Sequence, residues 1–398
     1  MDGPVESAVV PAVGTAGSLS VVRSLGRRGV HTIAVSELES PPSFSSRYCD
    51  ETKAVPSPAD DLPGYRDALL ALATRDDVGL IVPVREVDVY LLAKHRSAFA
   101  AHMRTPWPTF EQLGTVHDRI RLFDAAERAD VTVPETALLD EIDDWDRERI
   151  VKGRYAILTA DNTHTVPEGQ IHSPPKTIFL EPGVEPDVDT IVEEMGHVPI
   201  TQEYVAGEEY CFRGLYADGE PVVTSQKRLV RGYKYSRGPS VFHEAVDIPQ
   251  LEAAGRALLA ELDWDGLASV GFIRDDTGAF KLLEINPRTP SSMPMDIHAG
   301  LDYPYYWWQL AAGEDVGDHR ADYRSGTASH LIRGEVAHLY SVLAEDYSLT
   351  ESPSVPGTVW AIASSMVTHP NFDYFSLDDP APFVRDWLNV GREFIPRA

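Results

Sequence analysis

One stretch decides how this chain folds: Lys281-Leu282-Leu283-Glu284-Ile285-Asn286-Pro287-Arg288. Its apolar start predicts a β-strand, in which residues two apart project to the same face. We therefore expect Glu284, Asn286 and Arg288 to share one face, while Leu283 and Ile285 pack into the core. A carboxylate beside an amide oxygen suits Mg²⁺, and a neighbouring guanidinium suits a phosphate. The alternative is a strand end with three solvated polar side chains.

Length and composition describe a globular protein of two or three domains. The chain has 398 residues, of which 43% are hydrophobic, and a single core stops growing near ~250–300 residues. No apolar run approaches the ~18–20 residues of a membrane span, and residues 1–4 show no signal-peptide pattern. The two cysteines, Cys49 and Cys211, predict buried free thiols in a reducing, cytoplasmic compartment.

The charge is strongly acidic. There are 62 Asp and Glu against 35 Lys and Arg, a net charge of −27. Nucleic acids and anionic membranes need basic surfaces, so the balance excludes both as partners. It fits a surface adapted to strong salt, where screening reduces self-repulsion, and we expect a halophilic cytosol.

The first third of the chain opens with a βαβ pattern. An apolar run at 8–13, a helical pattern at 19–25 and an apolar run at 30–35 predict it. The glycines Gly14 and Gly17 do not form G-x-G-x-x-G, so we expect a Rossmann-like domain without its own nucleotide. A Rossmann oxidoreductase is the alternative, and it leaves residues 284–288 unexplained.

The middle of the chain predicts strands that alternate like those of an antiparallel sheet. The expected strands are 200–205, 210–216, 221–225 and 268–273, and the expected helices are 88–101, 117–129, 188–195 and 253–262. A turn centred at Thr277-Gly278 pairs Gly271 with Glu284. After about residue 315 the pattern becomes irregular and aromatic, and we expect a packed cap containing Trp360, Phe372, Tyr374 and Phe375.

This order of elements, ending in Leu283-Glu284-Ile285-Asn286-Pro287-Arg288, resembles that of ATP-grasp proteins of the carboxylate–amine ligase and carbamoyl-phosphate-synthase-like kind. The resemblance covers residues 5–315 and implies an α/β and α+β ATP-grasp fold. The domains it implies are an N-terminal Rossmann-like pre-ATP-grasp domain at 1–115, a small lid subdomain at 116–205, a large subdomain with the metal and phosphate site at 206–315, and a C-terminal cap at 316–398.

The resemblance also implies which residues bind ATP: Arg119, Lys152, Gln202, Glu203, Val205 and Glu209. Residues 202–205 resemble the linker between the two halves, whose backbone near Glu203 and Val205 would contact the adenine edge. Glu209 would accept the ribose hydroxyls, and Lys152 would contact the α-phosphate. Arg119 stands where the family has Lys. The alternative for Glu209 is an acidic surface pair, and for Lys152 it is a lysine whose ammonium group extends to solvent. For Arg119 the alternative is an ordinary arginine on a helix surface.

A basic cluster, Lys227, Arg228, Arg231, Lys234 and Arg237, resembles the family's basic loop at the phosphate end of the site. It would hold the γ-phosphate and a substrate carboxylate, with Lys227 and Arg228 as the leading catalytic candidates. Arg288 would stabilise the acyl phosphate or the tetrahedral intermediate by fixed charge, and Glu284 and Asn286 would hold the metal. A salt-bridged exposed loop is the alternative for the cluster.

The implied activity is ADP-forming ligation of a small carboxylate to an amine, or a thiol, with ATP and Mg²⁺ or Mn²⁺. No side-chain nucleophile is needed, so we expect no Ser-His-Asp set. Gly271 departs from the family, which usually has Asp, Glu or Gln facing the metal there. With Gly271 there, either one metal ion remains, or a water takes the place of the missing ligand, or catalysis is lost. Because of the last possibility, a non-catalytic ATP-binding regulator is the second hypothesis. A homodimer is compatible with the sequence.

Overall fold

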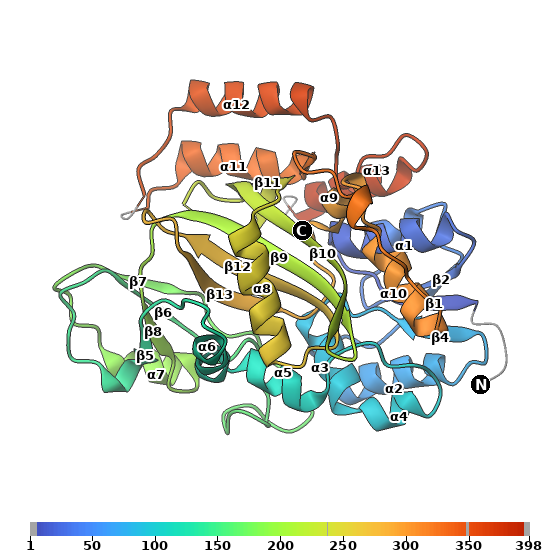
Figure 1. The fold of residues 1–398 in the computed structure, drawn as a ribbon, viewed down its shortest axis with the longest axis horizontal. Helices are drawn as coiled ribbons and strands as arrows, with labels where there is room; N and C mark the ends of the chain where they lie inside the picture. Colours follow the sequence, from blue (N-terminus) through green and yellow to red (C-terminus); the bar gives the residue numbers. More distant parts are fainter. Residues whose placement is uncertain (1–5, 237, 348–349, 394–398) are drawn as a thin grey trace.

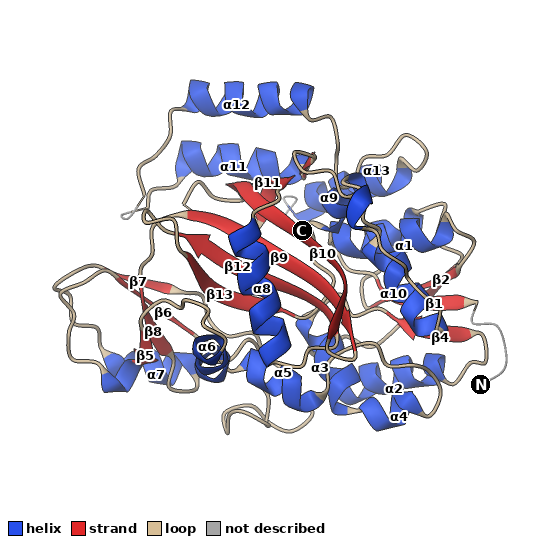
Figure 2. Ribbon diagram, viewed as in Figure 1, coloured by secondary structure: helices blue, strands red, loops and turns tan. Residues whose placement is uncertain are grey.

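The protein is described by a computed structural model covering residues 6–236, 238–347 and 350–393. Within these ranges the strands form a central six-stranded sheet flanked by two four-stranded sheets (Figures 1 and 2). No helix in the described part of the chain is long and apolar enough to cross a membrane. Arg237 of the basic cluster lies outside the described residues.

The N-terminal sheet confirms the Rossmann-like opening. Its strands are parallel in the order β3-β2-β1-β4: β1 (Ser7–Pro11), β2 (His31–Ser36), β3 (Glu51–Ala54) and β4 (Val78–Ile81). The surrounding helices are α1 (Ala16–Gly26), η1 (Pro42–Ser45), α2 (Leu62–Ala73), α3 (Glu86–Lys94), α4 (Arg96–Ala100) and α5 (Phe110–His117). Val9 and Ile33 are fully buried, as expected for a parallel sheet covered on both faces.

A small antiparallel sheet follows in the order β5-β8-β6-β7. It consists of β5 (Thr136–Leu138), β6 (Arg149–Lys152), β7 (Ile178–Leu180) and β8 (Ile200–Glu203), with η2 (Leu139–Glu141) and the helices α6 (Arg119–Arg128) and α7 (Val188–Met195). Asp118 begins α6 by accepting a hydrogen bond from the Ile120 amide. Gly196 ends α7 in the left-handed conformation at φ 70°.

The central sheet has the order β13-β12-β9-β10-β11-β14. Its strands are antiparallel: β9 (Glu208–Ala217), β10 (Glu220–Gly232), β11 (Ser240–Ala245), β12 (Gly266–Arg274), β13 (Phe280–Asn286) and β14 (Ala328–His330). Helix α8 (Pro249–Glu261) lies across one face (Figure 1). The helices α9 (Met293–His298) and α10 (Tyr303–Ala312) contact α1 of the N-terminal sheet.

The hairpin of β12 and β13 confirms the predicted pairing of Gly271 with Glu284. The route to this pair differs from the prediction, because Phe272 pairs with Leu282 and leaves Leu283 as an extra residue. Such a bulge reverses the facing of side chains on one side of it. Leu282 and Ile285 are therefore buried, whereas Leu283 lines a cavity, and the expectation that Leu283 packs into the core is wrong.

The C-terminal region is more regular than predicted. It contains η3 (Arg320–Asp322), β14 and the helices α11 (Ile332–Ala344), α12 (Val355–Thr368) and α13 (Ala381–Glu393). Tyr374 is buried, and the Phe372 and Phe375 rings are in edge contact at 6.1 Å. Trp360 instead has 74% of its surface exposed, because α12 lies above α11, away from the central sheet (Figure 1). The prediction that Trp360 belongs to a packed aromatic cap is therefore wrong.

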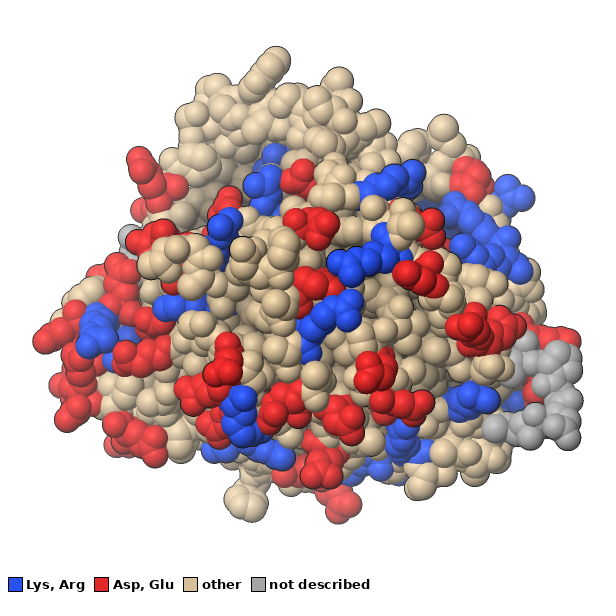
Figure 3. Space-filling model, in the orientation of Figure 1, with Lys and Arg blue, Asp and Glu red and all other residues tan. Residues whose placement is uncertain are grey.

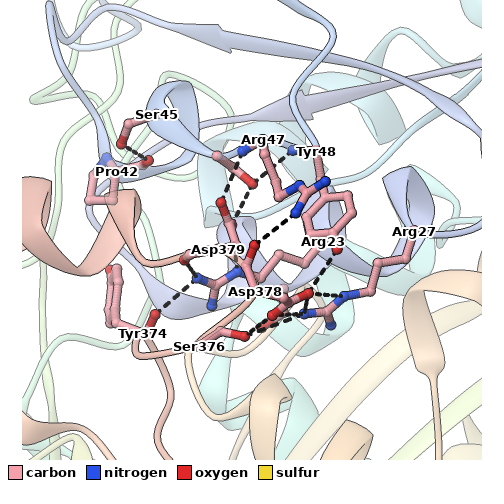
Figure 4. A network of polar contacts seen from close by, with 12 residues as sticks. Arg23, Arg27, Pro42, Ser45, Arg47, Tyr48, Tyr374, Ser376, Asp378 and Asp379 are labelled. Atoms are coloured by element: carbon pink, nitrogen blue, oxygen red, sulfur yellow. Dashed lines mark hydrogen bonds and ion pairs between the residues drawn. The ribbon is translucent and has the colours of Figure 1, made fainter.

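A polar network fastens the segment before α13 to the first helix of the chain (Figure 4). Arg23 of α1 forms an ion pair with Asp379 at 2.9 Å, and both side chains are buried. The Asp379 carboxylate also accepts hydrogen bonds from the Ser46 hydroxyl and the Arg47 amide. Directly after the end of α1, Arg27 pairs with Asp378 at 2.9 Å on the surface. The segment before α13 is therefore joined to the N-terminal region by charge, and α13 also packs against η1.

Candidate active site

A cavity of about 610 Å³ lies between the small sheet and the central sheet. Its volume is within the ~300–1,000 Å³ range of small-molecule sites. Its charged lining, among the described residues, consists of Arg119, Lys152, Arg213, Lys227, Arg288, Glu209 and Glu284. A chain of net charge −27 thus concentrates cations in its cavity, which suits an anionic ligand.

The end of β13 supplies the polar group expected from the sequence. Glu284, Asn286 and Arg288 all line the cavity. The Asn286 amide donates to Glu284 Oε1 at 3.0 Å, and Arg288 Nη2 donates to Asn286 Oδ1 at 3.0 Å. Arg119, from the start of α6, places Nη2 3.5 Å from Glu284 Oε2. A carboxylate, an amide oxygen and two guanidinium groups therefore meet at one point.

Glu284 is held in its ionised form. Desolvation favours the neutral acid, but the charge of Arg119, the hydrogen bond from Asn286 and the charge of Lys152 together lower the pKa of Glu284. No group of three or more His, Cys, Asp or Glu in the described ranges is arranged to hold a metal ion. Mg²⁺ is commonly bound by one or two carboxylates plus substrate phosphates. Glu284 and Asn286 fit a nucleotide-bound Mg²⁺ and do not form a complete cage of their own.

Arg288 is positioned from the N-terminal domain. Its Nε lies 2.9 Å from Glu86 Oε1, at the start of α3, and Glu86 Oε2 lies 3.1 Å from His117 Nε2. Desolvation would raise the pKa of Glu86, but the hydrogen bond to His117 and the charge of Arg288 lower it. Sequence reasoning missed Glu86, because an acid in the first turn of a helix is also what helix capping requires.

The predicted ATP-binding residues separate into two groups. Arg119, Lys152, Gln202 and Glu209 line the cavity. Glu203 does not: its side chain accepts from Lys281 Nζ at 2.6 Å, and its backbone amide donates to the Glu135 carbonyl at 2.9 Å. Val205 lies in the linker between β8 and β9 and does not line the cavity either. The side chains of Glu203 and Val205 are thus not brought to this site, and only their backbone could face a ligand.

The side chains of the basic cluster do not all point into the cavity, because most of the cluster lies on strand β10 and not in a loop. Lys227 lines the cavity, while Arg228, its neighbour on β10, points to the other face and pairs with Glu244 at 2.7 Å. A register shift follows in the β10–β11 pairing, and Arg231 pairs with the buried Glu335 at 2.8 Å. The structure therefore does not bring Arg228 to this cavity, and the same holds for Arg231.

Arg213 is a cavity residue that sequence reasoning missed. It forms a buried ion pair with Asp296 of α9, and its Nη2 donates to Ser292 Oγ at 3.0 Å. Lys227 Nζ donates to the same Ser292 Oγ at 3.2 Å. The available signal was an arginine inside the apolar run 210–216, since arginine is almost never fully buried unless it is paired.

Lys227 is half-buried and has no ion-pair partner among the described residues. Desolvation lowers its pKa, and the charge of Arg213 adds to this, whereas Glu209 and Asp373 act in the opposite direction. An anion bound in the cavity would supply the missing counter-charge. This arrangement makes Lys227 the strongest anion-binding candidate of the predicted cluster.

Comparisons with known proteins agree with this geometry. The family described as "ATP-grasp in the biosynthetic pathway with Ter operon" matches residues 199–331, a third of the chain, which run from β8 to β14. No curated protein sequence matches the chain. The match and the structural neighbours below support assignment to the ATP-grasp superfamily.

Three solved structures show the same fold. The biotin carboxylase domain of Hydrogenobacter thermophilus 2-oxoglutarate carboxylase, a dimer in complex with MgADP, ADP and bicarbonate, is 15% identical with a TM-score of 0.62, over 82% of this chain and 74% of that one. Campylobacter jejuni biotin carboxylase, in a β,γ-ATP complex, is 14% identical with a TM-score of 0.59, over 81% and 74%. Staphylococcus aureus N5-carboxyaminoimidazole synthetase is 12% identical with a TM-score of 0.57, over 77% of each chain. The expected ATP-grasp fold with its Rossmann-like N-terminal domain is confirmed.

Proposed function

We propose that this protein is an ATP-dependent ligase that activates a small carboxylate as an acyl phosphate and joins it to an amine, releasing ADP and phosphate. The observation that carries the proposal is the meeting of Glu284, Asn286 and Arg288 in a cation-lined cavity between two sheets. The ATP-grasp fold, and neighbours whose descriptions include ADP, magnesium and bicarbonate, are consistent with it.

The roles follow from position and charge. Lys152 and Arg119 would bind phosphates at the small-sheet side of the cavity, and Lys227 would bind them from β10. Arg288 would stabilise negative charge on the reacting carboxyl group, since Glu86 holds its guanidinium in place. Glu284 and Asn286 would hold Mg²⁺ or Mn²⁺, which neutralises charge during phosphoryl transfer. The cationic lining favours an anionic substrate such as an amino acid.

A second function, ATP binding without catalysis, is favoured by Gly271. This residue lies opposite Glu284, where a carboxylate or amide would face the metal in the resembling family. A Cβ added at Gly271 would meet its nearest atom at 3.7 Å, so packing does not demand glycine here. The missing ligand is therefore a chemical difference, and it leaves the metal with fewer protein oxygens.

The test is ADP and phosphate release by the purified protein with Mg-ATP in high KCl, across carboxylate and amine pairs. Glu284→Gln removes the proposed metal ligand, and Glu208→Gln is a matched control, because Glu208 contacts Tyr210 and does not line the cavity. We expect substrate-dependent release that is lost only in Glu284→Gln. ATP binding without turnover on any pair would favour the regulator, and no ATP binding would overturn both functions.

Other expectations from the sequence stay predictions. They are the domain boundaries at 115, 205 and 315, the halophilic cytosol, and a homodimer. One structural neighbour is described as a dimer, which is consistent with the last of these. Light scattering of the purified protein in high KCl would measure its mass directly.

A further inference from the structure

A serine, a histidine and an aspartate meet behind Lys227, although no such set was expected. Ser240 of β11 lines the cavity, and its Oγ lies 3.1 Å from Nδ1 of His243 on the same strand. His243 Nε2 lies 3.5 Å from Asp373 Oδ1, and both side chains are buried. Asp373 comes from the C-terminal segment, 130 residues further along the chain, so no sequence pattern links the three.

The surroundings select one protonation state for His243. The Asp373 carboxylate faces Nε2 and favours the tautomer that carries its hydrogen there, so Nδ1 accepts the Ser240 hydroxyl. Burial lowers the pKa of His243, the charges of Lys227 and Arg213 add to this, and Asp373 opposes it. His298 is a further titratable group within electrostatic reach. Burial therefore favours the neutral imidazole, whose Nδ1 lone pair faces the Ser240 hydroxyl and can accept its proton.

The serine touches the proposed reaction site. Lys227 Nζ donates to Ser240 Oγ at 3.2 Å, and the same nitrogen contacts Ser292. Ser240 thus lies at the end of the cavity where Lys227 would hold the phosphate that leaves. The carboxylates in the described lining are Glu209 and Glu284, and Glu284 is assigned to the metal in the proposed function.

We propose that Ser240, backed by His243 and Asp373, takes the proton from the amine that attacks the activated carboxylate. This role rests on the proposed ligase function and adds to it the group that makes the amine a nucleophile. The C–N bond forms and the bond from carbon to the phosphate oxygen breaks, so phosphate leaves with the electron pair. Before the attack, one N–H proton of the bound ammonium passes to Ser240 Oγ while the serine's own proton passes to His243 Nδ1, and Asp373 stabilises the imidazolium. The second N–H proton leaves the nitrogen as the amide forms and passes to the departing phosphate.

The C-terminal segment is therefore part of the site. The Asp373 amide donates to the His330 carbonyl at 2.9 Å, and its carboxylate accepts from Ser329, which places the carboxylate against β11. Six residues on, Asp379 is anchored by Arg23 (Figure 4). Ser240 is the residue that touches the reacting atoms, and His243 and Asp373 are positioning residues that act through it.

Comparing two nucleophiles, hydroxylamine and an alkyl amine, distinguishes a role in deprotonating the amine from a role in activating the carboxylate. Hydroxylamine is uncharged at neutral pH and traps an acyl phosphate as a hydroxamate without help from a base, whereas an alkyl ammonium must lose a proton. We expect Ser240→Ala, His243→Gln and Asp373→Asn to lower amide formation by about 10²–10⁴-fold and to leave hydroxamate formation close to that of the wild type. Ser240→Thr keeps the hydroxyl and should restore amide formation.

Asp386→Asn is the matched control, since Asp386 is also buried in the C-terminal region but pairs with Arg333 at 2.8 Å. It should change neither reaction. In the protein without ligands, NMR titration of His243 should show a lower pKa in Asp373→Asn, because the favourable carboxylate is gone.

Three results would overturn the relay. Equal loss of amide and hydroxamate in Ser240→Ala would mean that the serine acts only in activation or structure. An unchanged His243 titration in Asp373→Asn would remove the third member. A wild-type protein that forms no hydroxamate with any carboxylate would overturn the ligase function itself, and the relay with it.

Discussion

Lys227 and Arg228 show how one position along a strand decides a side chain's role. Both are cations in the same basic run, yet Lys227 faces the cavity and Arg228 pairs with Glu244 outside it. Lys227→Ala removes an anion-binding charge, and the neighbouring Arg213 is already paired with Asp296. We expect kcat/KM to fall by about 10²-fold or more, while Arg228→Ala leaves it little changed. Steady-state kinetics of the two variants would decide, and an equal loss in both would contradict the assignment.

Gly271 is a second residue whose surroundings yield a prediction. Its Cβ position is open, with no atom nearer than 3.7 Å, whereas a Cβ at Gly255 would lie 2.2 Å from the Phe212 ring. Gly271→Asp should therefore fold and place a second carboxylate opposite Glu284. We expect a lower Mg²⁺ concentration to give half-maximal ATP binding, measured by calorimetry.

Gly255→Ala is the contrast for the same experiment. Overpacking against Phe212 should cost roughly 1–3 kcal/mol of unfolding free energy, measured by urea denaturation. A Gly271→Asp protein that loses as much stability as Gly255→Ala would show that the space beside Glu284 is not available.

At the scale of elements, helix α1 and the residue that follows it hold the C-terminal segment by two ion pairs of different burial. Arg23 and Asp379 have side-chain exposures of 8% and 1%, while those of Arg27 and Asp378 are 38% and 44%. Removing one partner of a buried pair costs about 3–5 kcal/mol because the other charge stays buried and uncompensated. Exposed pairs contribute about 0–1 kcal/mol.

Arg23→Ala should therefore destabilise the protein several times more than Arg27→Ala. Urea denaturation would measure both, and limited proteolysis should cleave the segment before α13 earlier in Arg23→Ala. Equal losses in the two variants would mean that packing of α13 against the N-terminal domain, and not the Arg23–Asp379 pair, holds the segment.

For the whole molecule, buried and half-buried histidines predict how stability depends on pH. Desolvation lowers the pKa of His95, His197, His243, His298 and His338. Unfolded histidines titrate near ~6.5, so below that pH the unfolded state binds more protons than the folded state. The free energy of unfolding should fall as the pH is lowered from 7.5 to about 5.5. His338→Gln should reduce this slope in urea denaturation, and an unchanged or reversed slope would contradict the sign.

Net charge predicts the response to salt. Acidic and basic side chains are interspersed over the lower part of the face in Figure 3, and the surface above them, over α12, is uncharged. Salt screening weakens exposed ion pairs, but each of these contributes only about 0–1 kcal/mol. Screening also weakens the repulsion among the excess acidic side chains of a chain with a net charge of −27. Unfolding free energy should therefore rise between 0.1 and 2 M KCl, as the Debye length shortens from about 10 Å to under 3 Å. A fall in stability with KCl would contradict the halophilic interpretation.

Local regularities carried the successful sequence predictions. The βαβ opening, helix α7 and the Gly271–Glu284 pair follow from hydrophobic period and turn chemistry, which act over a few residues. The same reasoning failed at Leu283, where one extra residue in the strand changed which side of the sheet the side chain faces. It also failed for the C-terminal helices, because the aromatic and small residues of α12 do not show the polar–apolar alternation of a surface helix.

The sequence by itself determined the strand that carries Glu284, Asn286 and Arg288, because alternation along a strand is a property of the backbone, and its order of elements resembled that of ATP-grasp proteins. Only the tertiary structure decided which distant groups reach that strand. Glu86 meets Arg288 across 202 residues, and Asp373 meets His243 across the boundary of two regions. Such contacts depend on how whole helices and strands pack together, and the local hydrophobic pattern of the sequence carries no information about which distant residues will meet.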